Sequence, residues 1–156
     1  MYNTILLAVA LQSWTEFSTH AKAAREAAIS LAKGSDQRLY FLTVYDYDRI
    51  VTPAMLEEQK QLIPKRDLEQ YMAEEEQKMS RYLSPIEEAG IQVERIVKFG
   101  NPREEIAKTA REIGAEIIVM GAHSKRDISN TPLGGTAESV IGKSPCQVLL
   151  VSAHNL

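Results

Sequence analysis

The stretch VMGAHSKRDISNTPLGGTAESVIGKSPCQVLLV, residues 119–151, carries the pattern that decides the fold. An apolar run leads into a polar segment with glycines, a short helical pattern begins at Gly135 or Thr136 and ends near Gly142, and a second apolar run follows. Two such runs joined by a helix are typical of neighbouring parallel strands, which need a long crossover between them. The stretch therefore predicts a strand–helix–strand unit in which Gly134 and Gly135 precede or open the helix.

The same alternation extends over the whole chain. Five β-rich runs lie at residues 4–9, 38–45, 92–99, 116–120 and 147–152. Several of them are apolar throughout, as expected of strands that are buried on both faces, whereas the third run alternates more and is expected at an edge. We predict an α/β fold with an open five-stranded parallel sheet and helices on both faces.

Two long helical patterns lie in the first half of the chain. Ser13 and Glu16 resemble a capping box at the start of the first helix, which Gly34 should end. A longer second helix has an apolar face over residues 68–86 and should end at Gly90. We expect its charge-rich opposite face to be solvated.

The third helix has the clearest start in the chain. Asn101 supplies an N-cap, Pro102 suits the first turn, and Glu104 is placed to reach back to the cap, while Gly114 should end the helix. Residues 46–65 lack a clean period and contain two prolines, so we treat them as a long excursion after the second strand.

The length and the net charge of the chain exclude several classes of protein. The 156 residues suit one domain, residues 1–156, and a formal net charge of −3 without a basic stripe argues against nucleic acid as a partner. The apolar run at the amino terminus is too short for a membrane span or a secretory signal, so we expect a cytoplasmic protein without a membrane partner. The single Cys146 lies in an apolar stretch and is expected to be a core thiol rather than a nucleophile.

The carboxyl ends of the strands form the expected binding site. In an open α/β sheet, ligands bind beyond these ends, at the point where the strand order reverses. Backbone N–H groups near Gly134 and Gly135, together with the positive end of a helix dipole, would suit an anion there. A plain turn before a helix would explain the same two glycines. The residues alone leave both interpretations open.

Several segments resemble one known family. Residues 100–151 contain a G-N-P helix start, a strand that ends in M-G, the sequence L-G-G-T-A-E-S-V and a closing P-C-Q-V-L-L-V strand, and these resemble the universal stress protein family. The opening ILLAVALQS, residues 5–13, is similar to the first strand of that family. The resemblance covers nearly the whole chain and is weakest over residues 46–76. It implies a Rossmann-like sheet of strand order 3-2-1-4-5, with the adenine nucleotide alpha hydrolase-like architecture.

The resemblance also implies a nucleotide-binding motif. Many members bind ATP or a related adenine nucleotide through G-2x-G-9x-G-(S/T), which falls here on Gly121, Ser124, Gly134 and Gly135. Ser124 replaces the second glycine and Gly135 replaces the hydroxyl residue. Ala10 stands where nucleotide-binding members have an aspartate at the end of the first strand. These departures imply weak binding with reduced selectivity for ATP.

Five further residues complete the expected nucleotide site and its possible metal site. Val44 stands where a backbone contact to the adenine would be made, and Thr136 could replace the missing hydroxyl if the loop shifted by one residue. His123 is expected at the rim of the ligand rather than in a catalytic role. Asp46 and Asp48 could hold Mg²⁺ beside a triphosphate, although no third acidic ligand accompanies them.

Two functions follow from these features. The first is a cytoplasmic stress-response module that binds an adenine nucleotide and presents a partner surface that changes with occupancy. It is not an enzyme, no residue is assigned to catalysis, and slow ATP hydrolysis is left open. The alternative is a dimeric protein-interaction module of the same family that has lost nucleotide binding. The resemblance implies a homodimer that forms through the last strand, with an interface made by Val148, Leu149, Leu150 and Val151. A further protein partner is also expected, and its identity is unknown.

Overall fold

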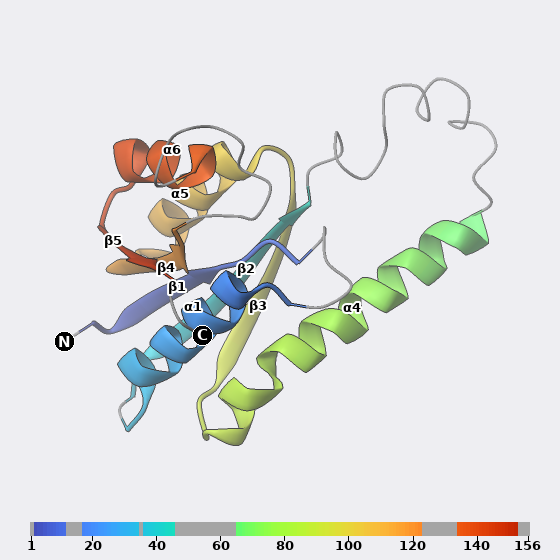
Figure 1. Cartoon of the computed structure of the whole chain (residues 1–156), viewed down its shortest axis with the longest axis horizontal. Coiled ribbons are helices and arrows are strands. Elements are labelled where there is room, and N and C mark those ends of the chain that lie inside the picture. The colour runs from blue at the N-terminus through green and yellow to red at the C-terminus, as the bar shows by residue number, and fades with distance from the viewer. Residues whose placement is uncertain (1, 12–16, 35, 46–64, 123–133, 153–156) are drawn as a thin grey trace.

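One parallel sheet forms the centre of the molecule. The computed structural model describes residues 2–11, 17–34, 36–45, 65–122 and 134–152, with the side chains of residues 65–69 and 71 excepted. The order of the five strands is β3-β2-β1-β4-β5, and all neighbours are parallel (Figure 1). The predicted fold class and strand order are confirmed. The strands are β1 (Thr4–Ala8), β2 (Arg38–Tyr45), β3 (Val93–Phe99), β4 (Ile117–Gly121) and β5 (Gln147–Val151).

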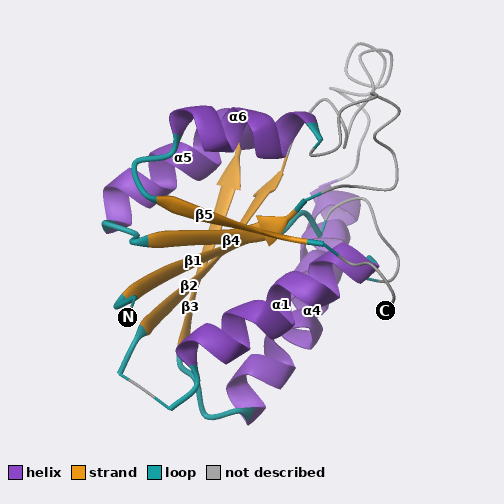
Figure 2. Ribbon diagram, turned by 60° about the vertical axis from the view of Figure 1, so that its left-hand side comes forward, coloured by secondary structure: helices purple, strands orange, loops and turns teal. Residues whose placement is uncertain are grey.

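Helices cover both faces of this sheet, as predicted (Figure 2). Side chains of β1 alternate between two cores: Ile5 and Leu7 face α1 and α4, whereas Leu6 and Ala8 face α5 and α6. All four side chains are buried, which is why the strand reads as a continuous apolar run. The helices are α1 (Thr19–Ala32) and α4 (Lys65–Glu88) on one face, and α5 (Pro102–Ile113) and α6 (Gly135–Lys143) on the other.

β3 and β5 are the edge strands, and the prediction for the third run is confirmed. Val97 and Phe99 on β3 are 39% and 44% exposed, and Leu149 on β5 is 37% exposed. Both strands therefore present apolar side chains at an edge whose outer side pairs with no other strand among the described residues. No helix in the described part of the chain is long and apolar enough to span a membrane.

The start of α1 differs from the prediction. The helix begins at Thr19, and the N-cap is Ser18, whose Oγ accepts a hydrogen bond from the backbone N–H of Ala21 at 3.1 Å. Ser13 and Glu16 lie outside the described residues, and the expected capping box is not the start of this helix. Ser18 offers the same hydroxyl acceptor, so the sequence pattern alone could not choose between two serines.

The observed ends of α5 and α6 agree with those predicted from the sequence, except for the expected capping box of α5. Asn101 is the N-cap of α5, its Oδ1 accepts from the N–H of Arg103 at 3.0 Å, and Gly114 ends the helix in the left-handed conformation at φ 66°. Glu104 does not close a capping box with Asn101, because its carboxylate pairs with the ammonium of Lys143 at the end of α6. α6 spans Gly135–Lys143, within one residue of its predicted end.

Tyr82 connects α4 to α1. Its hydroxyl donates a hydrogen bond to the carbonyl oxygen of Ala21 at 2.6 Å, and Arg25 of α1 lies over its ring at 5.1 Å and donates to its carbonyl oxygen at 3.0 Å. Burial raises the pKa of Tyr82 well above its usual value. The hydroxyl therefore stays protonated and acts as the donor.

Cys146 is less buried than predicted. It is partly exposed just before β5, where it packs against the core beneath α5 and α6. The hydroxyl of Ser144 donates to the carbonyl oxygen of Cys146 at 2.7 Å and lies 3.6 Å from its sulfur. The thiol is therefore a packing group at the rim of the core rather than inside it.

Candidate functional site

The strand register brings the predicted strand-end residues to one edge of the sheet. Ala8 pairs with Leu42, and the N–H of Val9 donates to the carbonyl oxygen of Leu42 at 3.0 Å, so Ala10 follows β1 at the level of Val44 on β2. β4 flanks β1 on the other side and ends at Gly121. The strand order reverses between β1 and β4, which is where such sheets bind ligands.

Gly134 sets the start of α6 at this edge. It is the N-cap of the helix, with φ 81° and ψ 152°, and it provides no side-chain hydrogen bond to the first turn. This backbone conformation is accessible essentially to glycine alone. The turn itself therefore requires Gly134, and a glycine N-cap contributes no capping side chain of its own at the positive end of the helix dipole, where an anion would be favoured. Both interpretations of the sequence are consistent with this geometry.

A substitution measures how strongly the turn depends on this glycine. Gly134→Ala should lower the free energy of unfolding by about 1–3 kcal/mol, because a Cβ is strained at this φ and ψ. Urea denaturation followed by circular dichroism measures the change. Gly142→Ala in the same helix is the matched control: its Cβ would meet nothing within 4 Å, and we expect unchanged stability or a gain of up to about 1 kcal/mol. Equal effects of the two substitutions would show that the strained turn is not the cause.

Gly121 has a packing role that the sequence did not indicate. A Cβ at this position would lie 3.0 Å from the Cβ of His20, which is in the first turn of α1. The lack of a side chain at residue 121 therefore helps the amino end of α1 to approach the end of β4 closely, because a Cβ there would crowd His20. This contact explains the glycine without any ligand, so Gly121 alone is weak support for a nucleotide site.

Gly135 faces a side chain from the neighbouring helix. A Cβ at position 135 would lie 2.3 Å from Nη2 and 3.1 Å from Cζ of Arg103, the second residue of α5. The guanidinium thus occupies the space that a side chain at position 135 would need. Sequence reasoning missed Arg103, because no local spacing relates it to a residue in another helix. Thr136, the second residue of α6, is partly buried.

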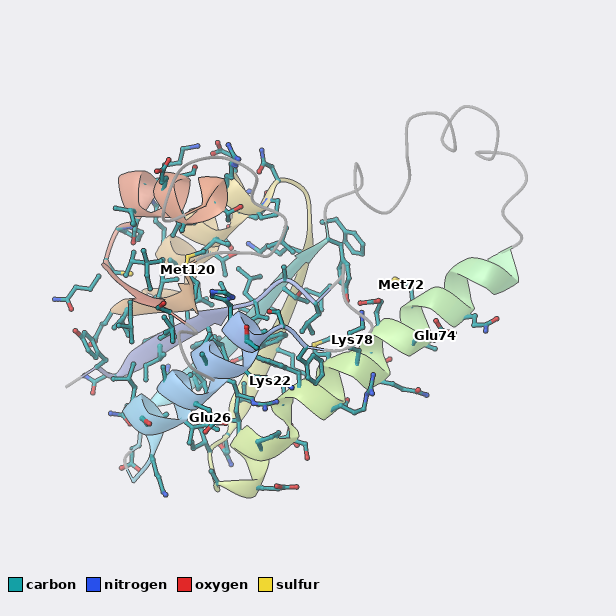
Figure 3. The ribbon with its side chains drawn as sticks, in the orientation of Figure 1. Lys22, Glu26, Met72, Glu74, Lys78 and Met120 are labelled. Carbon is teal, nitrogen blue, oxygen red and sulfur yellow. The ribbon has the colours of Figure 1, made fainter. Side chains whose placement is uncertain are left out.

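A buried charged cluster lies behind the strand ends on the opposite face of the sheet. The Nζ of Lys78 donates to Oε1 of Glu75 at 3.1 Å and to the carbonyl oxygen of Leu11 at 2.8 Å, and the hydroxyl of Tyr45 donates to Oε2 of Glu75 at 3.2 Å. Figure 3 shows Lys78 where α4 passes the sheet. Leu11 and Tyr45 directly follow Ala10 and Val44 in the chain. The cluster therefore fixes the backbone beside two of the predicted site residues.

The burial of Glu75 and Lys78 corrects the prediction that the charged face of this helix is solvated. Glu75 is 5% and Lys78 9% exposed. A signal was present in the sequence: Glu75 lies three residues after Met72 and four before Met79, so it occupies a position of the apolar stripe. A charged residue within such a stripe indicates a buried, paired charge.

The remaining predicted site residues lie outside the described part of the chain. These are His123 and Ser124 of the expected nucleotide loop and Asp46 and Asp48 of the possible metal site. Among the described residues, no group of three or more histidines, cysteines, aspartates or glutamates is placed to hold a metal ion. The assignment of individual residues to nucleotide binding therefore stays a prediction.

Comparisons with known proteins agree with this fold. The model of the universal stress protein family matches residues 1–152. The universal stress protein MJ0577 of Methanocaldococcus jannaschii is 39% identical over 82 residues, an alignment that spans 53% of this chain and 51% of that protein. The solved structure of MJ0577 superposes with a TM-score of 0.77 at 31% identity, covering 100% of this chain and 99% of that chain.

Two other solved structures contain a bound nucleotide. One universal stress protein, in complex with cAMP, is 19% identical with a TM-score of 0.63 and covers 97% of this chain and 98% of that chain. Another, from Archaeoglobus fulgidus in complex with dAMP, is 20% identical with a TM-score of 0.62 and covers 96% and 98%. At this level of identity the two structures show a shared fold. The family model matches nearly the whole sequence, and this chain therefore belongs to the universal stress protein family.

Proposed function

We propose that this chain is a regulatory module of the cytoplasm, not an enzyme, which binds an adenine nucleotide at the carboxyl edge of its sheet. The observation that carries the proposal is the start of α6 at Gly134, a glycine N-cap that has no capping side chain of its own and lies next to the strand ends. Universal stress proteins of the same fold bind cAMP and dAMP, which supports an adenine nucleotide as the ligand.

We expect the binding to be weak. Ala10 is exposed after β1, and its side chain has no group that could accept a hydrogen bond from a ribose hydroxyl. Phosphate contacts through backbone N–H groups would not by themselves distinguish ATP from AMP. Nucleotide occupancy would alter the surface around the α6 start, which is how the module would signal to a protein partner. A magnesium ion would accompany a triphosphate rather than a monophosphate.

Titration calorimetry on the purified chain tests this function. Wild type should bind ATP more tightly than GTP and should also bind AMP and adenosine, and mass spectrometry of freshly purified protein should detect a released adenine nucleotide. Ala10→Asp should tighten adenosine binding about tenfold to a hundredfold, because it adds a hydrogen bond to a charged acceptor. Ala89→Asp, the same change at an exposed position near the end of α4, is the control and should have no effect.

The second candidate function is a dimeric interaction module that does not bind nucleotide. It is favoured by the exposed apolar side chain of Leu149 and by the outer edge of β5, which pairs only with β4 among the described residues. We propose that two copies pair through this edge, with Val148, Leu149, Leu150 and Val151 in the interface. A dimer that binds none of the adenine compounds, with or without Ala10→Asp, would make this candidate the better account.

A further inference from the structure

We propose that Arg103 binds the phosphate of the nucleotide, in the role that a side-chain hydroxyl at position 135 would otherwise have. The inference rests on the proposed nucleotide binding and names a residue outside the expected motif. Its starting point is the contact between two helices: the guanidinium Nη2 of Arg103 lies 2.3 Å from the position that a Cβ of residue 135 would take. Gly135 is therefore not simply a lost hydroxyl, because its missing side chain makes room for a cation.

The packing of α5 on α6 holds Arg103 at this place. The two helices run side by side in the same direction on one face of the sheet (Figure 2). Arg103 meets Gly135 near their amino ends, and Arg111 donates to the carbonyl oxygen of Lys143 at 2.6 Å near their carboxyl ends. Eight residues separate the contacts on each helix. Both helix N-termini therefore lie together, with the guanidinium between them.

The positive charges at this place favour an anion, although α6 has one carboxylate of its own, Glu138, in its first turn. Arg103 is in the first turn of α5 and beside the first residue of α6, so its charge faces the positive ends of two helix dipoles. The nearby carboxylates of α5 pair elsewhere: Glu104 contacts Lys143, and Glu105 lies 3.9 Å from Lys98. None of the ion pairs among the described residues includes Arg103. A phosphate would interact favourably with the guanidinium and with both helix ends.

The chemistry of the side chain suits this ligand. A guanidinium presents two parallel N–H groups to two oxygens of one phosphate, and such charge-assisted bonds are stronger than the bond from a neutral hydroxyl. Arg103 is exposed, so its side chain can adjust to a mono-, di- or triphosphate. The interaction of Arg103 requires a phosphate group and contributes nothing to the affinity for adenosine. The comparison of AMP with adenosine therefore isolates its contribution.

Calorimetry with AMP, ATP and adenosine tests the proposal on the full chain. Arg103→Gln should weaken AMP and ATP binding about tenfold to a hundredfold and leave adenosine binding unchanged, whereas Arg103→Lys should be intermediate. Lys108→Gln removes one positive charge from an exposed position of the same helix and should leave all three affinities unchanged. Circular dichroism checks that each variant is folded.

A double substitution tests the space shared with position 135. In wild type, Gly135→Ser should weaken AMP binding or leave it unchanged, because its Cβ displaces the guanidinium. In the Arg103→Gln background, the same serine should strengthen AMP binding several-fold by adding a hydroxyl donor.

If wild type binds AMP more tightly than adenosine and Arg103→Gln does not reduce that difference, Arg103 is not the phosphate ligand, while the proposed function stands. If wild type binds none of the three compounds, both proposals fail.

Discussion

Glu75→Gln should lower the free energy of unfolding by about 3–5 kcal/mol, the cost of leaving one member of a buried ion pair without its counter-charge. The Lys78 ammonium and the Glu75 carboxylate are both almost fully buried, with 3.1 Å between Nζ and Oε1. After the substitution, the ammonium keeps its hydrogen bond to the carbonyl oxygen of Leu11 at 2.8 Å, but neither this carbonyl nor the new neutral amide can compensate for the charge. Urea denaturation at neutral pH measures the loss.

Two variants separate the buried charge from other causes. Glu74→Gln changes an exposed carboxylate one position earlier on α4 and should alter stability by less than about 0.5 kcal/mol. The double variant Glu75→Gln with Lys78→Met removes both charges and should regain most of the lost stability. If the single and double variants are equally unstable, the effect comes from lost packing around Tyr45 rather than from an unpaired ammonium.

Leu149→Glu should convert a dimer into a monomer. If two copies pair through the outer edge of β5, two-fold symmetry brings both introduced glutamates into one apolar interface, where the charges repel and lose hydration. We expect the dissociation constant of the dimer to rise at least about a hundredfold, as for the loss of an interface hot spot. Sedimentation velocity over a range of protein concentrations measures the change.

The opposite edge strand supplies the control for this experiment. Val97→Glu on β3 replaces an apolar side chain of similar exposure, 39% against 37% for Leu149. This substitution should leave the dimer intact if β5 forms the interface. A monomeric wild type, or a Leu149→Glu variant that remains dimeric at the lowest measurable concentration, would rule out pairing through β5.

The sequence by itself determined the fold class and the succession of strands and helices, because the relevant signals are local. Apolar runs of strand length, helical periods between them and the residue preferences of helix ends depend on neighbours within a few positions. Asn101 and Gly114 therefore bound the start and end of α5 correctly, and the alternating third run correctly predicted an edge strand. The family motif likewise directed attention to the strand ends and the start of α6.

Only the tertiary structure decided how side chains from separate elements meet. Lys78 reaches the carbonyl oxygen of Leu11 across 67 positions of the chain, and Arg103 of α5 fills the space beside Gly135 of α6. No periodicity encodes such contacts, because they depend on how two elements pack and not on the spacing within either. For that reason Glu75, whose charge the sequence predicted to be solvated, is buried. For the same reason, the space beside Gly135, where the motif indicates only a missing hydroxyl, is occupied by the guanidinium of Arg103.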